Sequence, residues 1–84
     1  NPSFLHTQAQ VFRRMALRTD SEFARQALRV KSRATLDRIP NQADSYVLGS
    51  RARLRVDSVS DALDKLKQNP SVAYEDELAD AIDQ

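Results

Sequence analysis

The sequence predicts an all-α fold, a small bundle of four to five short helices, from three observations. The chain has a single glycine among its 84 residues, whereas all-β sandwiches and barrels need many tight turns built from residues that tolerate positive φ. Its many alanine, leucine, arginine and glutamine residues favour helix. Apolar residues recur at steps of three and four, which is the spacing of helices with one buried face.

The chain length sets the size of the core. A chain of 84 residues hides roughly 60 to 65% of the surface that its unfolded form exposes, so its margin of stability is thin. There is no cysteine, and helix packing must therefore stabilise the core without disulfides or thiolate metal sites. We expect residues 1–84 to form a single helical domain and, because residue 1 is Asn and not Met, to be a fragment of a longer protein.

Two start signals predict the first two helices. The run Asn-Pro-Ser at residues 1–3 resembles a helix start, since proline is tolerated in the first turn, and this helix is expected to reach about Arg18. One side of it carries Phe4, Leu5, Val11, Phe12, Met15 and Ala16. The run Thr-Asp-Ser-Glu at residues 19–22 has the form of a capping box, in which Thr19 and Glu22 each satisfy a free N–H group of the second helix.

The second helix is expected to continue until Pro40 stops it. Its apolar residues fall on two stripes, and two stripes on one helix indicate two neighbouring helices. The main stripe consists of Phe23, Ala27, Val30 and Ala34, and the other of Leu28, Thr35 and Ile39.

Residues 46–56 fit two templates. As a helix, this segment extends to about Lys67 and carries a long stripe that we expect to be buried, formed by Leu48, Ala52, Val56, Val59, Leu63 and Leu66. As a strand, its apolar residues alternate with Arg51, Arg53 and Arg55, and Gly49 supplies a tight turn. The strand template gives an α+β alternative with a winged-helix-like hairpin at about 46–56. We favour the helix because strand-forming residues are otherwise sparse.

A last helix is expected after residues 69–71, where Asn-Pro-Ser occurs a second time. Its inward side is expected to hold Tyr74, Leu78, Ala81 and Ile82, and its outward side Asp76, Asp80 and Asp83. These aspartates belong to a segregation of charge along the chain. Residues 1–56 hold eleven Lys or Arg and four Asp or Glu, and residues 57–84 hold two and eight. The asymmetry indicates two halves that attract each other within the fold, which we favour, or a basic surface for an acidic partner.

Catalysis has few candidate residues. His6 is the only histidine, and on the helical wheel it lies on the polar side of the first helix, where we expect solvent. The acidic residues near the C-terminus lack the alternating ligands and central glycine of a calcium loop. We therefore expect no enzyme activity, no metal and no cofactor.

A row of arginines is the strongest indication of a partner. Arg25, Arg29 and Arg33 share one helix face at i, i+4, i+8 spacing, which is mildly destabilising and so favours an anionic partner. That partner is a phosphate backbone, an acidic protein surface or the chain's own acidic last helix, and we favour the last.

Residues 21–39 resemble a helix-turn-helix motif, with Phe23-Ala24 leading into Val30-Lys31. The small residue of the turn is absent, and nothing breaks the helix between Ala27 and Thr35. Together with a hairpin at 46–56 in the place of a wing, the resemblance implies a nucleic-acid-binding domain that contacts phosphates with arginines.

Our main hypothesis is a non-catalytic protein–protein interaction module that presents a basic helical face to a partner protein with an acidic surface. Nucleic acid binding is the alternative. The expected contact residues are Arg25, Arg29, Arg33, Arg51, Arg55 and Leu36. Leu36 is included because it, like Leu17 and Leu54, falls outside the main stripe of its helix. No apolar run approaches the ~20 residues of a membrane span, so we expect a soluble domain, with the cytoplasm as the default location. The sequence does not predict the oligomeric state.

Overall fold

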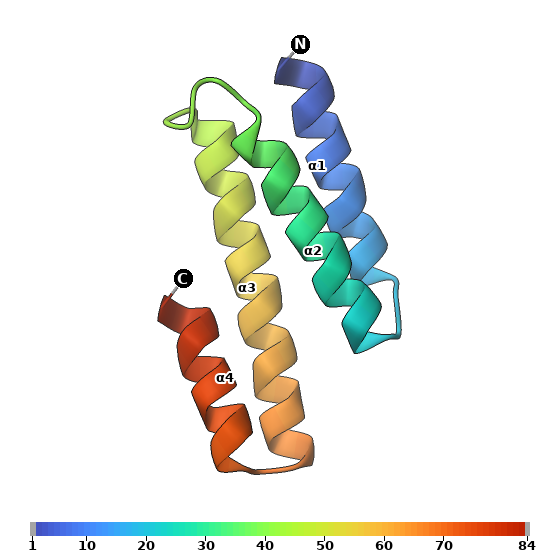
Figure 1. The fold of residues 1–84 in the computed structure, drawn as a ribbon, viewed down its shortest axis with the longest axis vertical. Coiled ribbons are helices and arrows are strands. Elements are labelled where there is room, and N and C mark those ends of the chain that lie inside the picture. Colours follow the sequence, from blue (N-terminus) through green and yellow to red (C-terminus); the bar gives the residue numbers. More distant parts are fainter. Residues whose placement is uncertain (1, 84) are drawn as a thin grey trace. The chain divides into compact units, whose positions relative to one another are not determined.

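A computed structural model describes residues 2–83 of the chain, which form four α-helices (Figure 1). They are α1 (Pro2–Leu17), α2 (Glu22–Asp37), α3 (Ser45–Gln68) and α4 (Val72–Asp83). The prediction of a small all-α bundle is confirmed. The chain divides into two compact units, Asn1–Leu54 and Arg55–Gln84, with the boundary inside α3.

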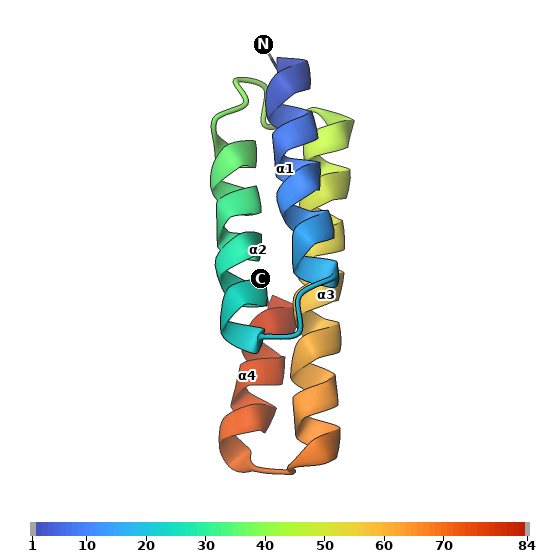
Figure 2. The same ribbon diagram turned by 90° about the vertical axis from the view of Figure 1, so that its right-hand side faces the viewer.

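In the first unit, α1 and α2 lie side by side and run antiparallel (Figures 1 and 2). Their contact is made by small residues: Ala9 of α1 and Ser32 of α2 are both buried. The Ser32 hydroxyl donates a hydrogen bond of 2.7 Å to the carbonyl oxygen of Ala9. Because the side chain of Ala9 ends at Cβ and that of Ser32 has only Oγ beyond it, the two backbones approach closely.

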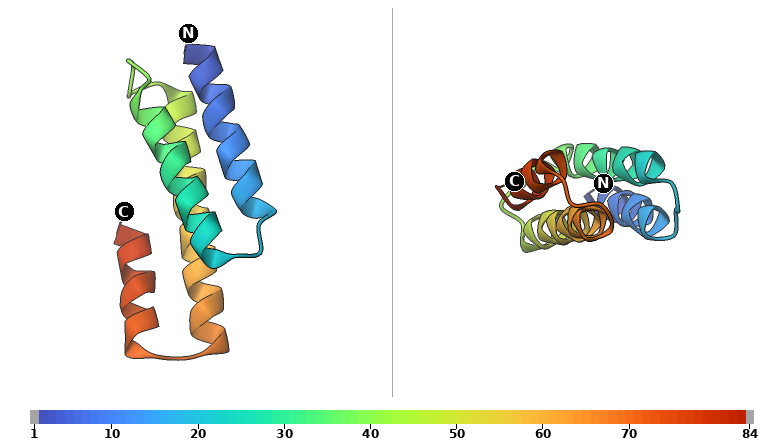
Figure 3. Two further views of the ribbon diagram at one scale, coloured as in Figure 1. Left: turned by 45° about the vertical axis from the view of Figure 1, so that its right-hand side comes forward. Right: turned by 90° about the horizontal axis from the view of Figure 1, so that it is seen from below.

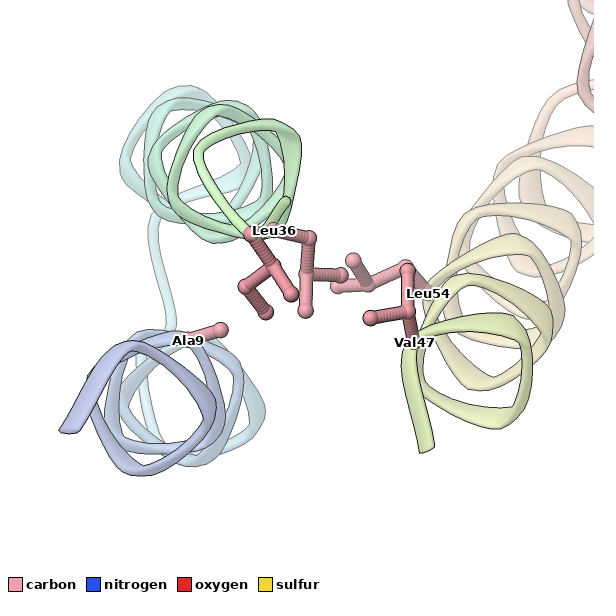
Figure 4. Close-up of a cluster of buried hydrophobic side chains, with 5 residues drawn as sticks. Ala9, Leu36, Val47 and Leu54 are labelled. Carbon is pink, nitrogen blue, oxygen red and sulfur yellow. The ribbon is translucent and has the colours of Figure 1, made fainter. Parts of the chain in front are cut away.

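The core of the first unit is built by α1, α2 and the start of α3. The side chains labelled in Figure 4 come from these three helices and point toward one another. The core cluster consists of Ala9, Leu36, Ile39, Val47 and Leu54, with Leu5 packed against it. Such a cluster depends strongly on its few large members, since apolar area buried sets the stabilisation.

The second helix starts two residues later than a Thr19 cap would place it. Ser21 is the N-cap, and its Oγ accepts a hydrogen bond of 3.3 Å from the backbone N–H of Ala24. The Thr19 hydroxyl instead donates to the carbonyl oxygen of Met15, at 2.7 Å, at the end of α1. The boundary predicted at residues 19–22 is therefore confirmed, and the assignment of the capping residue is wrong.

Replacing Ser21 with alanine is expected to lower the free energy of unfolding by about 1 kcal/mol, because an N–H group of α2 loses its acceptor. Thr19→Ala should cost less, since water can satisfy the exposed Met15 carbonyl that Thr19 contacts. Urea denaturation followed by circular dichroism measures both changes. A larger loss in Thr19→Ala than in Ser21→Ala would contradict this assignment of the cap.

Residues 46–56 lie within α3, which continues without a break from Ser45 to Gln68. The helix that we favoured for this segment is confirmed, and the hairpin alternative is wrong, because residues 2–83 contain no strand. Gly49 lies inside the helix and has no positive φ. Asp44 precedes the helix, and its carboxylate accepts a hydrogen bond of 2.7 Å from the Tyr46 N–H, which favours a helix start at this point.

In the second unit, the end of α3 and α4 form an antiparallel pair joined by a short turn (Figure 3). Ser71 precedes α4, as its start signal predicts, and its Oγ accepts a hydrogen bond of 3.1 Å from the N–H of Tyr74. Lys65 of α3 donates to both carboxylate oxygens of Glu77, at 2.8 and 2.7 Å. The same ammonium lies 4.9 Å from the centre of the Tyr74 ring. Lys65 therefore stabilises the packing of α4 against α3 through an ion pair and a cation–π contact.

The helices turn only part of the predicted stripes inward. On α2 the predicted main stripe is exposed, and the buried side consists of Arg29, Ser32, Thr35 and Leu36. The other predicted stripe of this helix is confirmed in part, because Thr35 and Ile39 are buried. On α3, Leu48 and Val56 are exposed, whereas Val47 and Leu54 are buried.

The other two helices show the same mixture. On α1, Ala16 of the predicted stripe is buried, but Phe4, Val11 and Met15 are exposed. On α4, Ala81 is buried and Ile82, expected inward, is exposed. Apolar side chains thus reach solvent on all four helices.

Candidate interaction surfaces

Arg25 supports the link between α1 and α2. Its guanidinium donates hydrogen bonds of 3.0 Å to the carbonyl oxygen of Thr19 and 2.7 Å to that of Asp20. These carbonyl groups follow the end of α1, where a cation is favourable. The first arginine of the predicted row therefore has a structural task within the first unit.

Arg29, Arg33 and Arg51 are brought together between α2 and the start of α3. Burial lowers the pKa of the Arg33 guanidinium, and the nearby positive charges of Arg29 and Arg51 lower it further. An arginine nevertheless remains charged at any ordinary pH. Arg29 is only 5% exposed, so it offers little surface to a partner.

Arg51 is engaged on the same side of the unit. It forms an ion pair with Asp37 and donates a hydrogen bond of 2.6 Å to the side-chain oxygen of Gln42. Gln42 in turn donates to the carbonyl oxygens of Leu36 and Ile39, at 2.8 and 2.6 Å. These bonds tie the end of α2 to α3, which is a structural role for Arg51.

The expectation that Leu36 is exposed is wrong. Leu36 is completely buried in the core cluster, and so is Leu54, whereas Leu17 is exposed. Leu36 lies one turn after Ser32, on the side of α2 opposite to the predicted main stripe, and that opposite side is the one that packs into the core. Arg55 differs from the other expected contact residues, because it is exposed and belongs to the second unit.

The outer side of α2 carries an apolar surface. Phe23 is 85% exposed and Val30 is 60% exposed, and Ala27 and Ala34 are exposed between and beyond them. We call these four residues the α2 stripe. They lie on the side of the helix opposite to the buried Ser32, as their spacing requires. Two cationic side chains, Lys31 and Arg38, are exposed along its edge.

The second unit has an apolar groove between the end of α3 and α4. It is open, has a volume of about 330 Å³ and is lined by Arg55, Val56, Val59, Ser60, Leu63 and Ile82. We call it the α3/α4 groove. Its size lies at the lower end of the range of binding pockets, and its lining is mostly apolar, as in sites that accept a side chain or small ligand.

His6 does not lie in solvent as expected. Its ring stacks on that of Tyr46, with centroids 4.4 Å apart and an interplanar angle of 24°. The Nε2 atom is buried and has no hydrogen-bond partner among the described residues. The Tyr46 hydroxyl lies 3.4 Å from the side-chain oxygen of Gln10. The histidine therefore helps to pack α3 against α1.

Other hollows and clusters give little basis for chemistry. A hollow lined in part by Gln10, Arg13 and Arg53 has a volume of about 10 Å³, which is the space of about one water molecule. Within residues 2–83, no three or more His, Asp or Glu side chains are grouped as metal ligands. None of the helices in this part of the chain has the length and apolar composition that a membrane crossing requires.

The sequence contained a signal for the α2 stripe. Phe23, Ala27, Val30 and Ala34 have the spacing of a helix face, but that spacing is the same for a face that is buried in the core and for one that binds a partner. Ser32 distinguishes the buried face from the exposed one, because a small residue that faces Ala9 allows α1 and α2 to pack closely on that side. The α3/α4 groove depends on how α4 packs, and sequence spacing does not reveal it.

No family model matches the chain, and neither the curated proteins nor the solved structures yield a match.

Proposed function

We propose that this chain is a non-catalytic protein–protein interaction module, and that the α2 stripe is its contact surface. The observation that carries the proposal is the exposure of Phe23 and Val30 on one line along the outer side of α2. The α2 helix buries Ser32 and Arg29 and exposes Phe23. Its most apolar side is therefore available to a partner.

The spacing of the α2 stripe fits a known mode of recognition. Its members occupy positions i, i+4, i+7 and i+11, which are the anchor positions of a helix that lies in a groove of another protein. Full burial of a side chain such as Phe23 or Val30 contributes about 1.5–3 kcal/mol. Phe23 is the main anchor, since aromatic side chains dominate such contacts.

The charges beside the stripe specify an acidic partner. Lys31 and Arg38 are exposed along its edge, so α2 presents a basic helical face, although through other residues than Arg25, Arg29 and Arg33. Charges at the rim of an interface act mainly on the association rate and on the choice of partner. Acidic groups beside an apolar surface of the partner would complement this face.

Photo-crosslinking tests the proposal in the cells that make the protein. A photoreactive residue at Ala27, within the α2 stripe, is expected to crosslink to a defined protein, and one at the exposed Ala73 of α4 is the control. Phe23→Ala should reduce the Ala27 crosslink about tenfold or more, since loss of an anchor costs over about 1.4 kcal/mol. Leu17→Ala should leave it unchanged, because Leu17 is exposed outside the stripe.

Two results would contradict the proposal. The first is equal crosslinking from Ala27 and Ala73, insensitive to Phe23→Ala. The second is recovery of nucleic acid in place of protein, with retention that falls by orders of magnitude between about 50 and 200 mM salt, as phosphate contacts require. That second result would support the nucleic-acid alternative.

A further inference from the structure

We infer that the partner of the α2 stripe is a second copy of this chain, whose α3/α4 groove receives the stripe. The inference rests on the proposed function and names the occupant of its contact surface. Both surfaces belong to the same chain, and both expose apolar side chains: Phe23 on the stripe and Val56 and Ile82 at the groove.

The two surfaces are of kinds that pack on each other, one the face of a helix and the other the space beside a pair of helices. The α3/α4 groove lies between two antiparallel helices, and its apolar lining comes from Val56, Val59 and Leu63 of α3 and Ile82 of α4. A third helix laid along such a pair completes a three-helix arrangement with side chains packed between those of its neighbours. Phe23 is the bulkiest side chain of the stripe and is the one that we place in the groove.

The charges favour a stripe in a groove over two stripes in contact. The helix that contributes Ile82 has four exposed carboxylates, on Glu75, Asp76, Asp80 and Asp83. Lys31 and Arg38 of an approaching α2 would meet this acidic helix. If two stripes met each other, the same cations would face cations, and such like-charge contacts oppose association. The unequal distribution of charge along the sequence, with excess positive charge before residue 57 and excess negative charge after it, acts in the same direction.

Each copy offers one stripe and one groove, so the contact joins two different surfaces. Two copies that use both pairs of surfaces form a closed dimer, and copies that use one pair at a time form a chain. Both outcomes increase mass with concentration, and both require an intact stripe and an intact groove. This requirement makes the inference testable by mixing two damaged variants.

Analytical ultracentrifugation of the 84-residue chain tests the inference. Phe23→Asp damages the stripe and leaves the groove, and Val56→Lys damages the groove and leaves the stripe. Each variant is expected to associate at least about tenfold more weakly than the unchanged chain. An equal mixture should regain association, because the stripe of the Val56→Lys chain can enter the groove of the Phe23→Asp chain.

Matched controls separate this effect from loss of fold or charge. Val56 is 65% exposed in the groove and Val72 is 73% exposed outside it, so Val72→Lys makes the same change on a surface that the inference does not use. Leu17→Asp is the control for Phe23→Asp. Both controls should associate like the unchanged chain, and circular dichroism should show equal helix content in all variants.

Three results would overturn the inference. If the unchanged chain stays monomeric up to about 1 mM, a self-contact weaker than about 4 kcal/mol has no role, while crosslinks from Ala27 to another protein would still support the proposed function. If Phe23→Asp abolishes association and Val56→Lys does not, stripe meets stripe. If the mixture stays monomeric although both variants are folded, the groove is not the acceptor.

Discussion

Replacing Leu36 with alanine is expected to lower the free energy of unfolding by about 2–5 kcal/mol, because burial is lost and a cavity remains. Leu36 is completely buried and is one of the largest side chains in the core cluster. It packs beside Val47 and Leu54 of α3 (Figure 4). Because the core cluster is small, few other apolar groups are present to fill the space that the Leu36 side chain would leave. A change of 1 kcal/mol shifts the melting temperature of a domain this small by about 4–8 °C, and differential scanning calorimetry should therefore record a fall of at least about 8 °C.

Leu17→Ala is the matched control for this change. Leu17 is 58% exposed at the end of α1, and substitutions at such positions usually alter stability by less than about 0.5 kcal/mol. Similar losses in Leu36→Ala and Leu17→Ala would show that the core cluster does not stabilise the fold as the structure indicates.

The number, type and approximate bounds of the helices were predictable, because local chemistry marks them. Ser21 and Ser71 precede α2 and α4 and accept hydrogen bonds from the first turns, and serine at such positions is a strong local signal. The helical state of residues 46–56 was favoured because strand-forming residues are sparse, although both a helix and a strand fitted the spacing of its apolar residues. The change of compact unit at Leu54 within α3 has no local signal, because no helix-breaking residue stands there.

The inward sides of the helices were not predictable from hydrophobicity. The most apolar side of α2, with Phe23 and Val30, is exposed, whereas its buried side contains Ser32 and Arg29. Hydrophobic periodicity gives a helix face but not its neighbour. In this chain the close approach of α1 and α2 at Ala9 and Ser32 determines which side turns inward, and that contact joins residues far apart in the sequence.

The arginines show the same division between local and long-range information. Spacing correctly places Arg25, Arg29 and Arg33 on related positions of one helix. It does not reveal that Arg25 donates to the carbonyl groups after α1, or that Arg51 pairs with Asp37. These contacts form only when the helices pack, and they leave Lys31 and Arg38 as the exposed cations beside the α2 stripe.

Replacing Ala9 with leucine is expected to destabilise the first unit by about 1–3 kcal/mol, because extra carbon atoms must enter a closely packed contact. Ala9 is buried, and its carbonyl oxygen lies 2.7 Å from the Ser32 hydroxyl. A leucine there would push α1 from α2 and stretch that hydrogen bond, although leucine is a good helix former. Urea denaturation should show a lower midpoint than in the unchanged chain.

The exposed Ala27 provides the matched control for this test. Ala27→Leu adds the same atoms on the outer side of α2 and should change stability by less than about 0.5 kcal/mol. If Ala9→Leu were neutral and Ala27→Leu destabilising, α2 would turn its Phe23 side inward, as hydrophobic periodicity alone predicts, and the α2 stripe would be part of the core. The pair of substitutions therefore tests the packing on which the proposed contact surface depends, without knowledge of any partner.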